Sequence, residues 1–151
     1  MATSEEFDRC IYCFAPKAYP GPCPHCGYDN GLCCPPGWWL LPGTVLKGRY
    51  VVGKHRKSTP TELTYLGWDL EEQCKVQIVE YFPEGLITRD ITNSEQISCI
   101  PGKAAAFEAG CREFYEKAKL FYDCTSQVRA VHLDFFARNG TCYYVRKKEA
   151  A

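Results

Sequence analysis

Hydrophobic and polar residues alternate along two segments near the middle of the chain. The segments 62–69 (ELTYLGWD) and 75–82 (KVQIVEYF) both follow this two-residue period, which is typical of half-buried β-strands. A shorter β-prone run covers 49–53. Segment 83–103 is polar and interrupted by proline and glycine, so we expect it to be irregular.

The second half of the chain contains one helical pattern. Between residues 104 and 124, apolar side chains recur at three- and four-residue steps, which is the spacing of one helix face. Two further strands are predicted at 128–137 and 141–146. The Asn139-Gly140 pair between them is a strong signal for a tight hairpin turn. Three strands, one helix and two strands predict an α+β fold.

The N-terminal part lacks such periodicity and is rich in cysteine. Six of the eleven cysteines fall between Cys10 and Cys34. We therefore divide the chain into a metal-stapled ribbon at 1–30, a Pro/Gly/Trp linker at 31–43 and a folded domain at 44–151.

Two C-x-x-C knuckles indicate a structural zinc ion. Cys10 and Cys13 form the first pair, and Cys23 and Cys26 form the second, nine residues further on. Each knuckle brings two thiolates together, and two knuckles complete the tetrahedral shell of a closed, non-catalytic zinc site. Disulfides are the alternative interpretation. His25 lies between two ligands, where a surface or supporting role is favoured over coordination, and the adjacent Cys33 and Cys34 are expected to lie outside the shell.

The charge balance and the lack of long apolar stretches exclude some classes of protein. The 18 basic and 18 acidic side chains balance, which argues against a nucleic-acid binder that works through bulk charge. The N-terminus has no apolar leader, and no apolar stretch is long enough to span a bilayer. We expect a soluble, cytoplasmic protein without a membrane partner.

Six runs of the chain form a distinctive series in order. They are CPHCGYD (23–29), LPGTVLKGRYVVGK (41–54), TYLGWDL (64–70), EYFPEGLITRD (80–90), FYEKAK (114–119) and VHLDFFARNGTCYYV (131–145). Together these runs resemble the N-terminal lobe of bacterial serine/threonine protein kinases, and in particular clostridial-type kinases that begin with a zinc ribbon. The resemblance implies a five-stranded antiparallel sheet with one main helix.

The same resemblance identifies departures at every nucleotide-binding position. The three glycines of the kinase G-x-G-x-x-G loop fall on Lys57, Thr59 and Glu62. The phosphate-binding lysine of the V-A-I-K strand falls on Val79, and the helix glutamate that pairs with it falls on Lys117. Because both partners of this ion pair have been replaced, we expect a degenerate, pseudokinase-like lobe that binds no ATP.

The sequence also lacks the H-R-D catalytic loop, the D-F-G motif and a C-terminal lobe, so we expect no kinase activity and assign no catalytic residue. The favoured hypothesis is a regulatory module that binds a protein partner, or a second copy, through the surface a C-terminal lobe would cover.

Two groups of residues could contribute to binding. Trp38 and Trp39 could form an interaction surface, although packing of the linker on the sheet is the simpler interpretation. Lys54, Arg56 and Lys57 could bind an acidic partner or nucleic acid, although a solvated hairpin tip is simpler. A zinc-ribbon nucleic-acid binder, a residual nucleotide binder and a fragment of a kinase-like protein remain alternative hypotheses.

Overall fold

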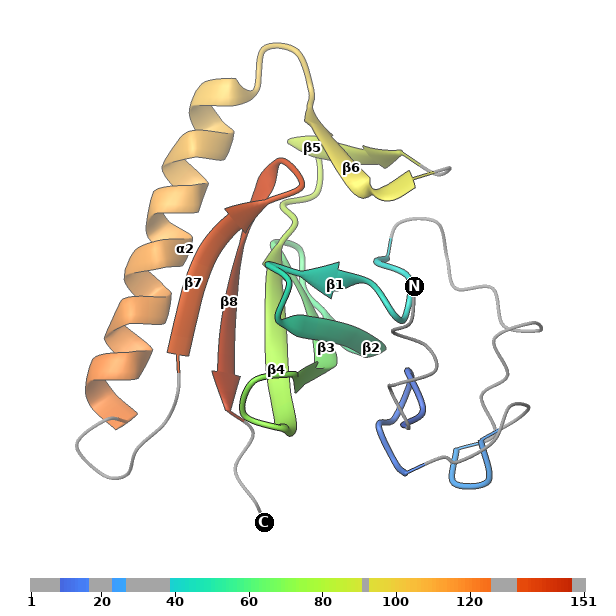
Figure 1. Ribbon diagram of the computed structural model, residues 1–151. Helices are drawn as coiled ribbons and strands as arrows, with labels where there is room; N and C mark the ends of the chain where they lie inside the picture. The colour runs from blue at the N-terminus through green and yellow to red at the C-terminus, as the bar shows by residue number, and fades with distance from the viewer. Residues whose placement is uncertain (1–8, 17–22, 27–38, 91–92, 126–132, 148–151) are drawn as a thin grey trace.

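The computed structural model describes residues 9–16, 23–26, 39–90, 93–125 and 133–147 (Figure 1). Within these ranges the chain forms one antiparallel sheet, a separate two-stranded sheet and one long helix. None of the helices in this described part is both long and apolar enough to cross a membrane.

The main sheet has six strands, so the expected number of five is wrong. The strands lie in the order β1-β2-β3-β4-β8-β7. Their bounds are β1 Val45–Leu46, β2 Tyr50–Ser58, β3 Glu62–Asp69, β4 Cys74–Tyr81, β7 Leu133–Arg138 and β8 Thr141–Lys147.

The extra strand is β1, which is two residues long and has no readable period. It folds back on β2 through Lys47 and Gly48, whose φ angles of 59° and 66° are those of a tight hairpin turn. The predicted strands at 62–69 and 75–82 correspond to β3 and β4. The predicted Asn139-Gly140 turn is also confirmed, with φ angles of 57° and 89°.

A second departure is that segment 83–103 is not irregular throughout. It contains β5 (Ile87–Asp90) and β6 (Asn93–Cys99), which pair with each other. Ile87 and Arg89 are buried while Thr88 and Asp90 are exposed. Strand β5 therefore has the two-residue period of burial. The hydrophobicity pattern does not show this period, because the buried residue Arg89 is charged.

The sheet has an inner and an outer face, because paired residues share a face and neighbours along a strand alternate. Tyr65, Ile78 and Tyr143 belong to the inner face, where side chains from all eight strands, together with Leu40 and Phe82, form the main core. Leu40 lies within the predicted linker, yet it is only 1% exposed. The core therefore includes residues that precede position 44.

Helix α2 (Ala104–Thr125) packs on the outer face, beside β7 and β8 (Figure 1). Phe114 and Ala118 contact a cluster formed by Val79, Tyr81 and Tyr144.

Helix and sheet approach closely near the start of α2. A Cβ atom at Gly110 would lie 1.6 Å from the hydroxyl oxygen of Tyr81, so only glycine fits at this crossing.

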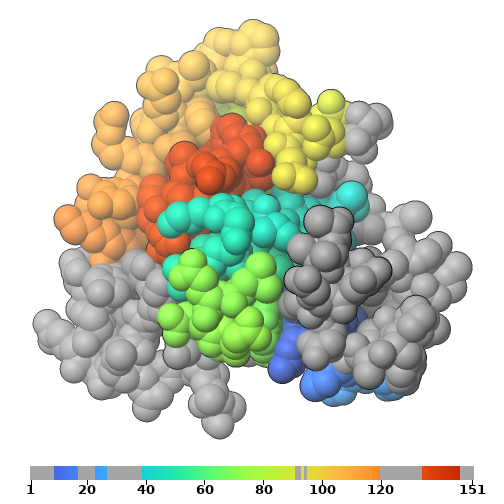
Figure 2. Space-filling model, viewed as in Figure 1, coloured from blue at the N-terminus to red at the C-terminus, as the bar shows by residue number. Residues whose placement is uncertain are grey.

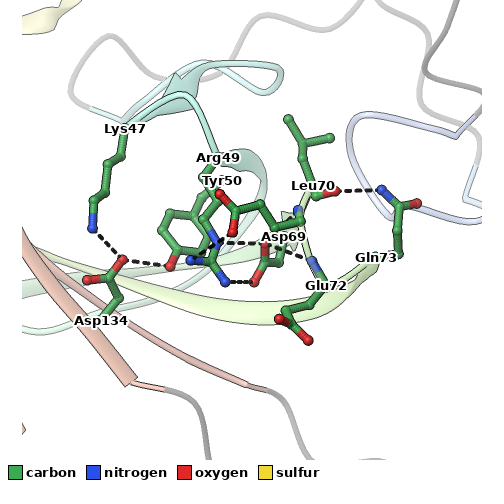
Figure 3. A network of polar contacts seen from close by, with 9 residues as sticks. Lys47, Arg49, Tyr50, Asp69, Leu70, Glu72, Gln73 and Asp134 are labelled. Carbon is green, nitrogen blue, oxygen red and sulfur yellow. Dashed lines mark hydrogen bonds and ion pairs between the residues drawn. The ribbon is translucent and has the colours of Figure 1, made fainter.

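The two ends of the sheet are joined by a polar cluster (Figure 3). Asp134 on β7 accepts hydrogen bonds from Lys47 Nζ at 2.8 Å and from the Tyr50 hydroxyl at 2.7 Å. Tyr50 also stacks on Phe136, with ring centroids 5.9 Å apart. Because Lys47 and Tyr50 lie on the β1–β2 hairpin, these contacts curl the sheet towards a barrel.

A second ion pair holds the turn after β3 (Figure 3). Arg49 binds Asp69 with two parallel hydrogen bonds, both 2.9 Å long. The same carboxylate accepts the backbone N–H groups of Glu71 and Glu72 at 2.9 and 3.2 Å. A buried carboxylate with four donors fixes the start of the turn that leads into β4.

A buried carboxylate also lies at the centre of the inner face. Glu80 is fully buried and accepts hydrogen bonds from the Tyr65 hydroxyl at 2.9 Å and the Tyr143 hydroxyl at 2.5 Å. Arg89 on β5 forms an ion pair with it. Desolvation lowers the pKa of Arg89, but the negative charge of Glu80 and its hydrogen bond with Arg89 outweigh it and raise the pKa. Arg89 therefore stays charged inside the core.

We predict that Glu80→Gln destabilises the fold by about 3–5 kcal/mol, because it leaves the Arg89 charge buried without its counter-charge. Urea unfolding followed by circular dichroism measures this. Glu116→Gln, an exposed change on α2, should shift the free energy of unfolding by less than about 0.5 kcal/mol. Equal effects of the two substitutions would contradict a central role for Glu80.

Acid should weaken the two carboxylate clusters shown in Figure 3. Burial raises the pKa of Asp69, but hydrogen bonds from Arg49 and the backbone outweigh it and hold the pKa below its usual value. Burial also raises the pKa of Asp134, but the hydrogen bonds from Lys47 and Tyr50 outweigh burial and lower this pKa. Both groups therefore stabilise the fold fully above the unfolded pKa of about 3.9, and this contribution is lost as pH falls through the folded value.

The corresponding experiment is urea unfolding at pH 7 and at pH 3. The free energy of unfolding of the unaltered chain should fall at pH 3, and Asp69→Asn should lower it at pH 7 and reduce the difference between the two pH values. The exposed change Glu84→Gln serves as the control. An unchanged pH dependence in Asp69→Asn would contradict the assignment.

Candidate metal centre and the outer face of the sheet

The four predicted zinc ligands converge at one point. The Sγ atoms of Cys10, Cys13, Cys23 and Cys26 all lie within 4.8 Å of one another. The Sγ atoms of Cys10 and Cys26 are 3.7 Å apart, and those of Cys13 and Cys23 are 3.8 Å apart. A tetrahedron with zinc–sulfur bonds of about 2.3 Å has edges of about 3.8 Å, so the donor set fits zinc.

These distances also decide against the disulfide alternative for the arrangement described, since a disulfide joins its sulfurs at about 2.05 Å. The cluster is formed by cysteines alone, and His25 is exposed beside it without being a member. Cys33 and Cys34 lie outside the described residues.

Backbone groups prepare the knuckles for an anionic ligand set. The N–H of Tyr12 donates to Cys10 Sγ, and the N–H of His25 donates to Cys23 Sγ, both at 3.3 Å. Desolvation raises the pKa of Cys23, but hydrogen bonds from the backbone of Cys26 and His25 outweigh it and lower the pKa to about 6. These hydrogen bonds favour the thiolate form of Cys23, which is the form that zinc binding requires. Desolvation raises the pKa of Cys13.

The first knuckle docks on the outer face of the sheet. Phe14, which follows Cys13 directly, is completely buried against Val51, Leu66 and Trp68. Its ring stacks on Trp68 with centroids 6.0 Å apart. The guanidinium of Arg9 lies 4.2 Å from the centre of a Trp68 ring. Ribbon and lobe are therefore packed together.

Backbone contacts reinforce this docking on β2. The N–H of Lys54 donates to the carbonyl oxygen of Tyr12 at 3.0 Å. A Cβ atom at Gly53 would lie 2.6 Å from the Phe14 ring, so glycine is needed where the knuckle crosses β2. No hydrophobic period in the sequence predicts this contact, although an aromatic residue directly after a zinc ligand is a feature that could have indicated it.

The loop that the sequence resemblance predicts to correspond to the kinase glycine loop is a tight turn between β2 and β3. Thr59 Oγ1 accepts the N–H groups of Thr61 and Glu62 at 3.3 and 3.0 Å, and Thr59 N–H donates to the Glu62 carbonyl at 2.8 Å. Pro60 has no N–H. Every backbone N–H group from 59 to 62 is thus bonded within the turn.

Val79, which the sequence resemblance predicts to occupy the position of the kinase lysine, lies in an apolar and covered environment. Val79 is 3% exposed and packs beneath α2 with Phe114 and Tyr144. It shares the outer face with Thr64, its partner on β3. By the same alternation Leu66 and Trp68 belong to that face, so α2 and the first knuckle cover different parts of one surface.

Lys117 and Glu62 form an ion pair that sequence reasoning missed. Lys117 Nζ on α2 lies 3.0 Å from Glu62 Oε2 at the start of β3. The hydrogen bond to Glu62 raises the pKa of Lys117. Relative to the kinase pattern, the cation is now on the helix and the anion on the sheet. The sequence pattern singles out Lys117 and Glu62 separately. It could not pair them, because their proximity depends on how α2 packs on the sheet.

The basic run lies on the outer half of β2. Lys54, Arg56 and Lys57 are exposed, and the pairing of β2 with β3 shifts register on both sides of His55. Lysines and bulges on a strand with little pairing on one side discourage edge-to-edge association. This role explains the run without a nucleic-acid ligand.

Of the two tryptophans of the linker, Trp39 lies within the described residues. Trp39 is half-buried and stacks on His55, with ring centroids 3.7 Å apart. Trp38 lies outside the described residues.

One further cysteine pair joins α2 to β8. The thiol of Cys142 donates to Cys111 Sγ at 3.3 Å. Desolvation and this hydrogen bond raise the pKa of Cys111 to about 12. Such a thiol is protonated at neutral pH and therefore unreactive, so we read the pair as packing.

Comparison with known proteins supports the fold. No family model matches the chain, and no curated protein matches it. A solved structure of the bacterial serine/threonine kinase PpkA (PpkA-294, apo form) is similar, with a TM-score of 0.63 and 20% sequence identity. The similarity covers 74% of this chain and 39% of that chain. The chain has a kinase-like fold with an added four-cysteine cluster, and it spans well under half of the PpkA-294 chain.

We predict that the chain binds one zinc ion and that Cys13→Ser or Cys23→Ser lowers the affinity by more than about 100-fold, since even supporting residues around a metal site are worth 10–100-fold. Competition with a chromophoric chelator measures the affinity. Cys74→Ser, a substitution outside the cluster, should leave it unchanged. A metal content that does not depend on Cys13 and Cys23 would refute the site.

Proposed function

We propose that this chain is a non-catalytic module, built from a zinc ribbon and a degenerate kinase-like N-lobe, which acts in regulation through binding to a protein. The observation that carries the proposal is the β2–β3 turn. Kinases hold ATP phosphates with the backbone of this loop. Here the turn at 59–62 uses its own N–H groups internally, so none is directed to a phosphate.

Two further features support the absence of nucleotide binding. A valine in place of the phosphate-binding lysine removes the positive charge that would bind phosphate. The apolar side chains around Val79 would also make a charged side chain at this position unfavourable. The Glu62 carboxylate at the end of the turn adds a negative charge where phosphates would lie, although Lys117 partly balances it. These features favour the pseudokinase interpretation over a residual nucleotide binder.

A protein partner is favoured over nucleic acid. The chain carries no net positive charge, and the exposed basic run is accounted for by the bulged strand β2. Large exposed hydrophobic side chains in the described part of the chain are Leu41, Val45 and Tyr115. Leu41 and Val45 lie close together in sequence before and within β1, so we propose that a protein partner or a second copy contacts this edge.

We predict that ATP with Mg²⁺ leaves the thermal unfolding midpoint of the chain unchanged, measured up to millimolar ATP. The double variant Val79→Lys with Lys117→Glu tests which feature excludes nucleotide. Because the turn is unaltered, this variant should also show no ATP-dependent shift. A shift in the unaltered chain would overturn the proposal, and a shift in the double variant alone would mean that the turn is not the deciding feature.

A further inference from the structure

An apolar stripe crosses three strands on the outer face of the sheet. Val45 on β1 pairs with Val51 on β2, and Val51 pairs with Trp68 on β3. Paired residues share a face, so the three side chains form a continuous row. Leu66 lies on the same face two residues before Trp68 and belongs to the same cluster.

The first zinc knuckle covers most of this stripe. Trp68 and Val51 are each only 5% exposed, and Phe14 has no exposed surface. Val45, at the end of the row, remains 45% exposed. The stripe is therefore a hydrophobic surface that is buried chiefly because the knuckle is docked on it.

The residues that hold zinc and the residue that covers the stripe belong to the same short turn. Cys10 and Cys13 are two of the four ligands, and Phe14 follows immediately. The turn closes through hydrogen bonds from Phe14 N–H to the Cys10 carbonyl at 2.9 Å and from Cys10 N–H to the Ala15 carbonyl at 3.0 Å. Any loosening of the ligand pair acts directly on Phe14.

Phe14 also adopts a backbone conformation that needs support. Its φ angle is 65°, in the left-handed region that is uncommon for bulky residues and costs of order 1–3 kcal/mol. Arg9 Nη1 donates to the Phe14 carbonyl at 2.9 Å, and the metal shell would hold the preceding residue. Without a metal, four cysteines contribute little to keep this turn closed.

We propose that the zinc ribbon is a metal-dependent cover: bound zinc keeps Phe14 on the stripe formed by Val45, Val51, Leu66 and Trp68, and loss of zinc uncovers that stripe while the lobe stays folded. The metal-dependent cover adds a mode of regulation to the proposed function. Only the biological role of the cover rests on the proposed function. The ATP experiment can fail without affecting it, because the test below uses neither nucleotide nor partner.

The test uses Trp68 as a reporter. The chain has three tryptophans, so Trp38→Phe and Trp39→Phe in the full chain leave Trp68 as the single emitter. Acrylamide quenching, binding of a hydrophobic dye and far-ultraviolet circular dichroism are then recorded under reducing conditions, with zinc bound and after its removal by a chelator. We expect zinc removal to raise quenching of Trp68 and dye binding several-fold, while the helical signal from α2 is retained.

Phe14→Ala separates the cover from the metal site. It keeps all four ligands, so it should retain one zinc ion yet show high quenching of Trp68 even with zinc bound. His25→Ala, an exposed change in the other knuckle, is the matched control and should behave as the parent. The proposal is overturned if Trp68 stays shielded after zinc removal, if Phe14→Ala leaves it shielded, or if chelation abolishes the helical signal.

Discussion

The fully buried carboxylate of Glu80 is the constraint on which the lobe depends. A charge removed from water must be matched by donors and a counter-charge, and these come from three elements: Tyr65 on β3, Arg89 on β5 and Tyr143 on β8. The β5–β6 hairpin must therefore lie over the inner face. This explains the run EYFPEGLITRD, because its first residue and its last but one are the two halves of the buried ion pair.

The same constraint sets the position of Val79. Side chains alternate along β4, so a carboxylate held on the inner face places its neighbour Val79 on the outer face, beneath α2. A slip of one residue would move the valine to the inner face and turn Glu80 towards the helix. Glu80 and Arg89 thus hold the register of β4 from the inner face. This register does not depend on which side chain stands at position 79, because that side chain lies on the opposite face of the strand.

Much of this architecture could be predicted from the sequence, because a local pattern of residues was enough to locate each of several elements. The period of two located β3 and β4, the helical period located α2, and the C-x-x-C spacing identified the four cysteines that converge. Other features could not be predicted, because they depend on contacts between distant residues. Strand β1 is too short to show a period, Arg89 masks the pattern of β5, and the proximity of Lys117 to Glu62 depends on how the helix crosses the sheet. The Thr59 turn required knowledge of which hydroxyl accepts which N–H group.

Sharing of the outer face connects the ribbon to the rest of the molecule. Helix α2 covers the outer face over β4 and β8, and the Phe14 knuckle covers it over β2 and β3. In Figure 2, α2 lies at the left of the strands and the described part of the ribbon lies below them. The two covers are held differently. The helix is held by an apolar cluster, a close approach at Gly110 and the Lys117–Glu62 pair. The contacts of the knuckle with the sheet include one aromatic side chain, an arginine over Trp68 and a backbone hydrogen bond, all on a strained turn. Because the metal ligands Cys10 and Cys13 lie in this same turn, the position of Phe14 on the sheet depends on the rigidity that four thiolates and a metal provide.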